Sequence, residues 1–223
     1  MGSATGFFYA RQKDESYFLV TNRHVVEDQD HPRIRFDALR LALHTDANDV
    51  RKNGSIDLPL YEGNNRLWRS FDDPGIDIVA LPLDKSAIHG FIIQAFSSSV
   101  LPPSDLQIGI GEDVLVIGYP LGFHDDVHNL PIFRNASVAS VYPVPFKGKP
   151  FFLIDARLHP GTSGSPVVLK PSTVLKKGGG LSFMSAPVTY LLGINSGEWK
   201  VRDEGLGLNA VWFASLVNEL TSS

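Results

Sequence analysis

Residues Pro160 to Val167 read PGTSGSPV and lie between two apolar runs, FFLI at 151–154 and VVL at 167–169. A hairpin turn needs only about two to five residues and commonly one glycine, so this stretch is richer in glycine and hydroxyl groups than a simple turn requires. Gly161 and Gly164 allow the backbone to bend so that its N–H groups converge beside one exposed hydroxyl. The stretch therefore favours Ser163 as a nucleophile.

Short apolar or β-branched runs, separated by Gly, Pro, Asn and Asp, recur along the whole chain. They lie at 6–10, 17–21, 33–36, 39–43, 77–83, 113–120, 136–142, 151–155, 166–169, 188–194 and 208–213. Many short strands of this kind are typical of antiparallel barrels or sandwiches. Only the tail at 213–221 has helical spacing, with Phe213, Leu216, Val217 and Leu220 on one face. The pattern predicts an all-β protein with a C-terminal helix.

The chain of 223 residues is long enough to bury a good core, and we expect one domain over 1–223. The Ser-, Pro- and Gly-rich stretch at 96–111 predicts a connection between two halves, with an ordinary long surface loop as the alternative. A second loose segment at 170–180 contains KKGGG and predicts the solvated tip of a hairpin.

Composition excludes several classes of function. Lys and Arg number 20 against 24 Asp and Glu, and this net charge of −4 argues against a nucleic-acid partner. No apolar run approaches the roughly 20 residues of a membrane-spanning helix. Zero cysteines exclude disulfides, thiol catalysis and Cys-ligated metal. The run HDDVH at 124–128 matches no metal-site spacing and is interpreted as a solvated loop, so no metal is expected.

The N-terminal residues 1–5 lack the basic start and long apolar stretch of a signal peptide, which favours the cytoplasm without fixing the compartment. The chain then enters an apparent strand at 6–10 almost at once. Such an abrupt start suits a chain trimmed from a longer protein, so we allow for a flanking or regulatory domain.

Three short motifs follow one another along the chain: TNRHVV around His24, GIDIVALPL around Asp77 and PGTSGSPV around Ser163. Each places a polar residue at the edge of an apolar strand, where a rigid scaffold fixes it and leaves its functional atom exposed. Taken singly, His24 is as well explained by a structural role and Asp77 by a turn. Together, in the order His, Asp, Ser, they match the residue types of a nucleophilic triad.

The order of these motifs and their amino-acid sequences resemble those of the trypsin-like serine proteases of the chymotrypsin fold. Within that family the chain is most similar to bacterial HtrA/Deg protease domains, and its GSPV ending resembles the glutamyl endopeptidases. The resemblance is carried by LVTNRHVV, DIVALPLD, VLVIGYPLG, ASVASVY, IDARLHPGTSGSPVV, LLGINSG and GLGLNAVWF, which span nearly the whole chain. It implies two antiparallel six-stranded β-barrels, at 4–95 and 110–212, with the active site in the cleft between them.

The resemblance makes His24 the general base, Asp77 its orienting carboxylate and Ser163 the nucleophile, with the N–H groups of Gly161 and Ser163 as the oxyanion hole. No metal or organic cofactor is implied. The chain departs from the family at Thr162, where Asn or Asp is usual. Thr162 cannot pair with a freed N-terminus, so trypsin-type activation is not expected. Ser165 replaces the usual second glycine, as it does in the glutamyl endopeptidases.

The resemblance also implies the substrate-binding residues. Arg157, Leu158, His159 and Pro160 are expected at the base and wall of the primary specificity pocket. Ser196 matches the position that supports the buried Asp, and the segment Ser196, Gly197 and Glu198 is expected to present an edge to an extended polypeptide substrate.

The residue preferred before the scissile bond depends on how these side chains are arranged. Leu158 favours an apolar residue. Arg157 would favour an acidic one unless it points outward or is neutralised by Asp155 or Glu198. Glutamyl endopeptidases carry a His where this chain has Asn195, which weakens the acidic option. We therefore expect Val, Leu or Ala, with Glu or Asp as the alternative.

The leading hypothesis is a serine endopeptidase that works through an acyl-enzyme. The first alternative is a catalytically silent protease-like module that binds extended peptides or a partner domain, because a fold does not guarantee activity. The second is an antiparallel β-barrel binding protein without protease chemistry, which requires the three ordered motifs to be a coincidence.

Overall fold

The computed structural model describes residues 2–28, 36–202 and 204–222. The first half contains β1 (Phe7–Arg11), β2 (Ser16–Thr21), β3 (Ala38–His44), β4 (Asn53–Pro59), β5 (Tyr61–Glu62), β6 (Asn65–Arg66), β7 (Arg69–Ser70), β8 (Val79–Leu83) and β9 (Ala95–Ser97). The second contains β10 (Asp113–Gly118), β11 (Ile132–Val138), β12 (Phe151–Asp155), β13 (Pro166–Leu169), β14 (Ser172–Lys177), β15 (Gly180–Val188), β16 (Leu191–Val201) and β17 (Glu204–Phe213). The helices are α1 (Arg23–Val26), α2 (Ala214–Ser222) and the 3₁₀ turns η1 (Ser98–Val100) and η2 (Pro120–Gly122).

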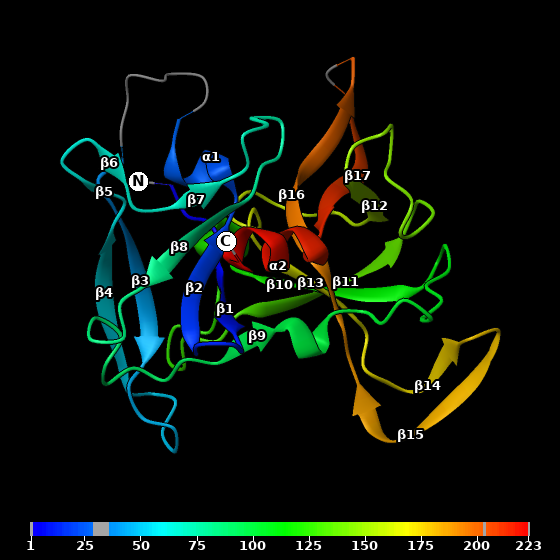
Figure 1. Cartoon of the computed structure of the whole chain (residues 1–223), viewed down its shortest axis with the longest axis horizontal. Helices are drawn as coiled ribbons and strands as arrows, with labels where there is room; N and C mark the ends of the chain where they lie inside the picture. Colours follow the sequence, from blue (N-terminus) through cyan, green and yellow to red (C-terminus); the bar gives the residue numbers. More distant parts are fainter. Residues whose placement is uncertain (1, 29–35, 203, 223) are drawn as a thin grey trace.

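The second half forms a closed six-stranded barrel in the order β10-β11-β12-β17-β16-β13 (Figure 1). All of its pairs are antiparallel. Strand β12 shows why the apolar runs of this half do not alternate with polar residues. Phe152 and Ile154 face one buried cluster, whereas Phe151 and Leu153 face another. A strand buried on both faces is apolar throughout.

The first half is a five-stranded sheet in the order β7-β8-β2-β1-β9. The resemblance implied a closed antiparallel barrel of six strands here, and the pairing differs in two respects. Strand β9 runs parallel to β1, because the chain reaches it through the long connection from 84 to 94 rather than through a hairpin. Strands β3 and β4 form a separate hairpin. It joins the sheet through a buried cluster that includes Leu58 of β4 and Leu81 of β8, and not through backbone pairing.

The buried cluster that contains Phe151 and Leu153 also joins the two halves and the C-terminal helix. Phe18 and Val20 of the sheet pack in the same cluster as Phe151 and Trp212 of the barrel. Three of the four residues expected on the apolar face of the helix, Leu216, Val217 and Leu220, are buried together in this cluster. Phe213 is buried too, but it ends β17 and packs in the other barrel cluster, because the helix begins one residue later than expected. Continuous packing of this kind fixes the two halves relative to each other. The structure thus confirms the predicted fold class, a chymotrypsin-like β architecture with a C-terminal helix.

Several segments differ in detail from the sequence-based expectation. The first residues of the stretch 96–111 belong to β9, so the connection between the two halves begins only after Ser97. The loose segment at 170–180 is the start of a long hairpin, β14–β15, that projects from the barrel (Figure 1) and turns at Gly178 and Gly179. Strand β4 was missed because its sequence, NGSIDLP, has few apolar residues. The strand expected at 33–36 lies almost entirely outside the described residues.

Candidate active site

The motifs around His24 and Asp77 meet because their strands are neighbours. Strands β2 and β8 pair antiparallel, with Thr21 opposite Val79. The end of β2 therefore lies beside the start of β8. His24 lies in the short helix that follows β2, and Asp77 lies two residues before β8. The side chain of Asn22 strengthens this junction by donating to the carbonyl oxygen of Asp77 at 2.7 Å.

The carboxylate of Asp77 accepts three hydrogen bonds. Its Oδ1 accepts the backbone N–H of His24 at 3.0 Å, and its Oδ2 contacts His24 Nδ1 at 2.8 Å. The hydroxyl of Ser196, on β16 of the barrel, donates to the same Oδ2 at 2.6 Å. Only 15% of the Asp77 side chain is exposed, so these donors replace most of the water that a carboxylate needs.

The imidazole of His24 is oriented by this contact. A carboxylate at Nδ1 holds the proton on that nitrogen and leaves Nε2 as the acceptor. The side chain is 39% exposed, and Nε2 has no hydrogen-bond partner among the described residues. His24 is therefore arranged to take a proton from a group on its open side.

Ser163 lies in the loop between β12 and β13 and is half-buried. Its hydroxyl donates to the carbonyl oxygen of Ser196 at 3.1 Å. No hydrogen bond joins Ser163 to His24 in the described part of the chain. Ser196 therefore contacts both other residues, Asp77 through its side chain and Ser163 through its backbone.

The backbone around Ser163 is bent at two glycines in the left-handed region, Gly161 with φ +95° and Gly164 with φ +82°. A Cβ at Gly164 would collide with the carbonyl oxygen of Thr5 and the hydroxyl of Thr21, so only glycine fits. Two backbone N–H groups of this loop, those of Gly161 and Ser163, donate to no described residue. Because buried N–H groups are nearly always paired, two free ones beside a hydroxyl mark a place where an acceptor can bind.

A family model described as a trypsin-like peptidase domain matches residues 4–174, well over half of the chain. The chain belongs to the trypsin-like peptidase family. No curated protein matches it significantly. Among solved structures, the peptidase is similar to the inactive form of a serine-to-alanine mutant of Rv3671c from M. tuberculosis. The two share 16% sequence identity, the match covers 98% of this chain and 80% of that chain, and the TM-score is 0.49.

Thr162 of this peptidase is buried, and its hydroxyl and backbone N–H form local hydrogen bonds. Its hydroxyl donates to the carbonyl oxygen of His159 at 2.8 Å, and its backbone N–H donates to the same oxygen at 3.2 Å. The hydroxyl thus closes the turn that precedes Ser163.

The four residues expected in the specificity pocket differ in their surroundings. Arg157 is exposed and forms no ion pair with any described residue, so neither Asp155 nor Glu198 neutralises it. Its carbonyl oxygen accepts from Arg134 at 2.7 Å. Leu158 packs against the barrel core. His159 is half-buried, with Nδ1 buried and without a described partner, and Pro160 is exposed.

The segment from Ser196 to Glu198 has one edge that no described strand covers. Strand β13 stops pairing with β16 at Ile194, whereas β17 continues alongside, with Gly197 opposite Ala210. The carboxylate of Glu198 is held by the backbone N–H of Gly207 at 3.0 Å. An extended chain can therefore add on the uncovered side.

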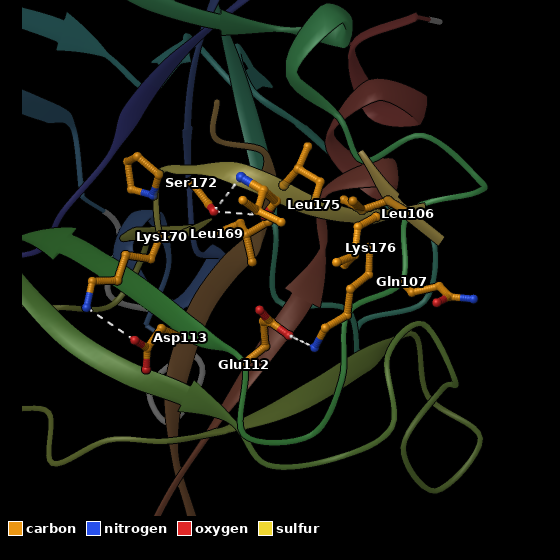
Figure 2. A pocket seen from close by; sticks show the side chains of 12 residues that line it. Leu106, Gln107, Glu112, Asp113, Leu169, Lys170, Ser172, Leu175 and Lys176 are labelled. Carbon is orange, nitrogen blue, oxygen red and sulfur yellow. Dashed lines mark hydrogen bonds and ion pairs between the residues drawn. The ribbon is translucent and has the colours of Figure 1, made fainter. Parts of the chain in front are cut away.

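A pocket of about 260 Å³ lies elsewhere, beneath the β14–β15 hairpin. Figure 2 shows its lining, with leucines such as Leu175 on one wall and ion pairs between Lys170 and Asp113 and between Lys176 and Glu112. None of the residues that line it belongs to the motifs around His24, Asp77 or Ser163. In the described ranges, no three His, Cys, Asp or Glu side chains are arranged to hold a metal, and no helix there is long and apolar enough to cross a membrane.

Two residues near Ser163 were not singled out from the sequence as contacts of its loop. Thr5 and Asn195 both hydrogen-bond to carbonyl oxygens of residues 161–163. The only sequence signal was the position of Thr5 directly before the first apolar run and of Asn195 directly before Ser196.

Proposed function

We propose that this trypsin-like peptidase is a serine endopeptidase that acts through a His24, Asp77 and Ser163 triad. The observation that carries the proposal is the 2.8 Å contact between Asp77 Oδ2 and His24 Nδ1, made beside a serine loop with two free N–H groups. A serine hydroxyl is barely ionised at neutral pH and needs a base that takes its proton and later returns it. His24 is the base whose tautomer suits this task.

In the proposed reaction, Ser163 Oγ attacks the carbonyl carbon of the scissile peptide bond while its proton moves to His24 Nε2. The resulting oxyanion accepts from the N–H groups of Gly161 and Ser163, where one donor is typically worth about 3–4 kcal/mol. His24 then protonates the leaving amine, and an acyl-enzyme on Ser163 remains. A water molecule, deprotonated by His24, hydrolyses the acyl-enzyme and restores the hydroxyl. Asp77 stabilises the imidazolium in both steps.

The substrate is proposed to be a polypeptide bound in extended form. The uncovered edge of β16 at Ser196–Glu198 supports this, since an added strand would run directly past Ser163. The motif order of the chain supports an HtrA/Deg-like subtype. Before the scissile bond we propose a small or medium apolar residue. The exposure of Arg157 supports this choice, because a guanidinium that remains solvated does not demand an acidic partner.

The alternative function, a catalytically silent module that binds extended peptides, has one observation in its favour. The Ser163 hydroxyl donates to Ser196 and forms no hydrogen bond with His24. Catalytic hydrogen bonds are often long in the absence of substrate, so this arrangement is also compatible with an active enzyme.

The test is covalent labelling with a fluorophosphonate, followed by mapping of the modified residue. We expect one equivalent of label on Ser163 in the folded protein, none in Ser163→Ala and little in His24→Ala. Heat-unfolded protein serves as the control for nonspecific reaction. A folded sample in which Ser163 does not react would favour the silent module.

A further inference from the structure

The backbone carbonyl groups of residues 160–163 all accept hydrogen bonds. The carbonyl of Pro160 accepts from the N–H of Leu121 at 2.6 Å, and that of Thr162 accepts from the N–H of Ser165 and the amide of Asn195. A trans peptide directs its C=O and its N–H in opposite directions. Fixing the carbonyls of Pro160 and Thr162 therefore fixes where the free N–H groups of Gly161 and Ser163 point.

The two remaining carbonyls of the loop are held by one residue from the opposite end of the sequence. Thr5 lies just before β1. Its hydroxyl donates to the carbonyl oxygen of Gly161 at 2.8 Å, and its backbone N–H donates to that of Ser163 at 2.9 Å. Thr5 is only 4% exposed, so water cannot easily replace these bonds.

The Thr5 hydroxyl also serves as an acceptor, and this links it to a second loop. The backbone N–H of Tyr119 donates to Thr5 Oγ1 at 3.1 Å. Tyr119 lies two residues before Leu121, whose N–H holds the carbonyl of Pro160. One hydroxyl thus connects the 119–121 segment with the loop that it supports.

The surrounding backbone leaves room for this threonine. A Cβ at Gly118 would lie 2.7 Å from Thr5 Oγ1, and a Cβ at Gly164 would collide with the Thr5 carbonyl oxygen. That carbonyl accepts in turn from the hydroxyl of Thr21 at 2.7 Å. Thr5 is therefore held at both its backbone and its side chain in a site that fits it closely.

We propose that Thr5 is a positioning residue for the oxyanion hole: its hydroxyl joins the Gly161 carbonyl to the N–H of Tyr119 and so holds the 119–121 segment, whose Leu121 N–H fixes the Pro160 carbonyl and with it the N–H of Gly161. The proposal rests on the function proposed above. In this role the Thr5 hydroxyl does not contact the reacting Oγ of Ser163. It acts on catalysis only through the orientation of the loop.

The decisive variant is Thr5→Val, which keeps the shape of the side chain and removes the hydroxyl. It leaves the carbonyl of Gly161 and the N–H of Tyr119 without their partner. We expect kcat to fall about 10- to 100-fold with KM changed less than about 3-fold, because a misdirected donor weakens only the transition state. The inhibition constant of a peptide aldehyde, which forms a tetrahedral oxyanion on the serine, should rise by a similar factor.

Two controls separate positioning from stability. Thr5→Ser retains the hydroxyl and should restore kcat to within about 3-fold of the wild type. Thr221→Val removes an equally buried hydroxyl, which donates within the C-terminal helix to the carbonyl of Val217, and should lower stability without changing kcat. Thr5→Val with unchanged kcat and aldehyde affinity, or Thr5→Ser as impaired as Thr5→Val, would overturn the proposal.

A readout independent of catalysis distinguishes this proposal from the proposed function. Amide hydrogen exchange at Tyr119 and Thr162 should accelerate in Thr5→Val relative to Thr221→Val. If wild-type Ser163 does not react with a fluorophosphonate, the proposed function fails, and the exchange rates still decide whether Thr5 holds the loop. Equal exchange rates in the two variants would show that it does not.

Discussion

The hydroxyl of Ser196 and the carboxylate of Asp77 form a 2.6 Å hydrogen bond across the two halves of the molecule. Asp77 precedes a strand of the N-terminal sheet, and Ser196 belongs to the barrel. The same serine accepts from Ser163 through its carbonyl oxygen. The relative position of the acid–base pair and the serine therefore depends on the packing between the halves.

Asp77→Asn should abolish most activity at neutral pH. Oδ1 accepts the backbone N–H of His24, so an asparagine oxygen would keep that bond and place its NH₂ against His24 Nδ1. The imidazole must then carry its proton on Nε2, where it cannot take one from Ser163. We expect a loss of ~10⁴-fold in kcat with the fold retained, measured by steady-state kinetics and circular dichroism. An activity within about 10-fold of the wild type would contradict the proposed role.

Ser163→Ala and His24→Ala should each lower kcat by several orders of magnitude, and the double variant should lose little more. Members of a triad act as a unit, so removing a second member costs little once the first is gone. Kinetics of both single variants and the double variant check this. Losses that multiply would indicate two independent contributions and would argue against the triad.

Gly164→Ala should destabilise the fold by about 2–5 kcal/mol, the sum of a left-handed backbone penalty and an overpacked contact with Thr5. The matched control is Gly148→Ala, where φ is +74° and a Cβ would meet nothing within 4 Å. The control should lose only about 1–2 kcal/mol. Urea denaturation of both variants measures the difference. Equal losses would show that close packing against Thr5 is unimportant.

Arg157→Ala should leave the apolar preference before the scissile bond unchanged, since Arg157 is exposed and forms no ion pair with a described residue. Cleavage of a peptide library by the wild type and the variant tests this. A strong preference for Glu or Asp in the wild type that disappears in the variant would overturn the apolar proposal and place the guanidinium in the pocket.

In Tyr142→Phe, the stability of the folded protein should decrease less steeply with rising alkaline pH than in the wild type. Burial raises the pKa of Tyr142 to about 12 from its usual value of 10, because the charged phenolate is poorly solvated there. The folded state thus favours the neutral phenol. Its contribution to stability is present below pH 10 and is lost as the pH rises toward 12. Denaturation midpoints between pH 9 and 11 should fall less steeply in the variant, and identical slopes would contradict this.

The barrel strands were predictable from sequence because their apolar residues are contiguous. Strand β12, buried on both faces, appears as the run FFLI, and β13 appears as PVVL. Strand β15 carries exposed side chains such as Phe183 beside polar ones and has no buried residue, so burial imposes no pattern on its sequence. The parallel pairing of β9 with β1 depends on the path of the intervening chain, which no local pattern encodes.

The sequence by itself determined the fold class, the family and the three motifs around His24, Asp77 and Ser163. The apolar pattern of a strand and the sequence of a motif both depend only on residues that are neighbours in the chain. Only the tertiary structure decided which groups meet across long separations. Thr5 and Gly161 hydrogen-bond although 156 positions separate them, and the Asp77–Ser196 contact joins residues 119 apart. Such contacts arise when packed halves bring distant backbone and side-chain groups within 3 Å, and their free energy depends on burial that a linear sequence does not display.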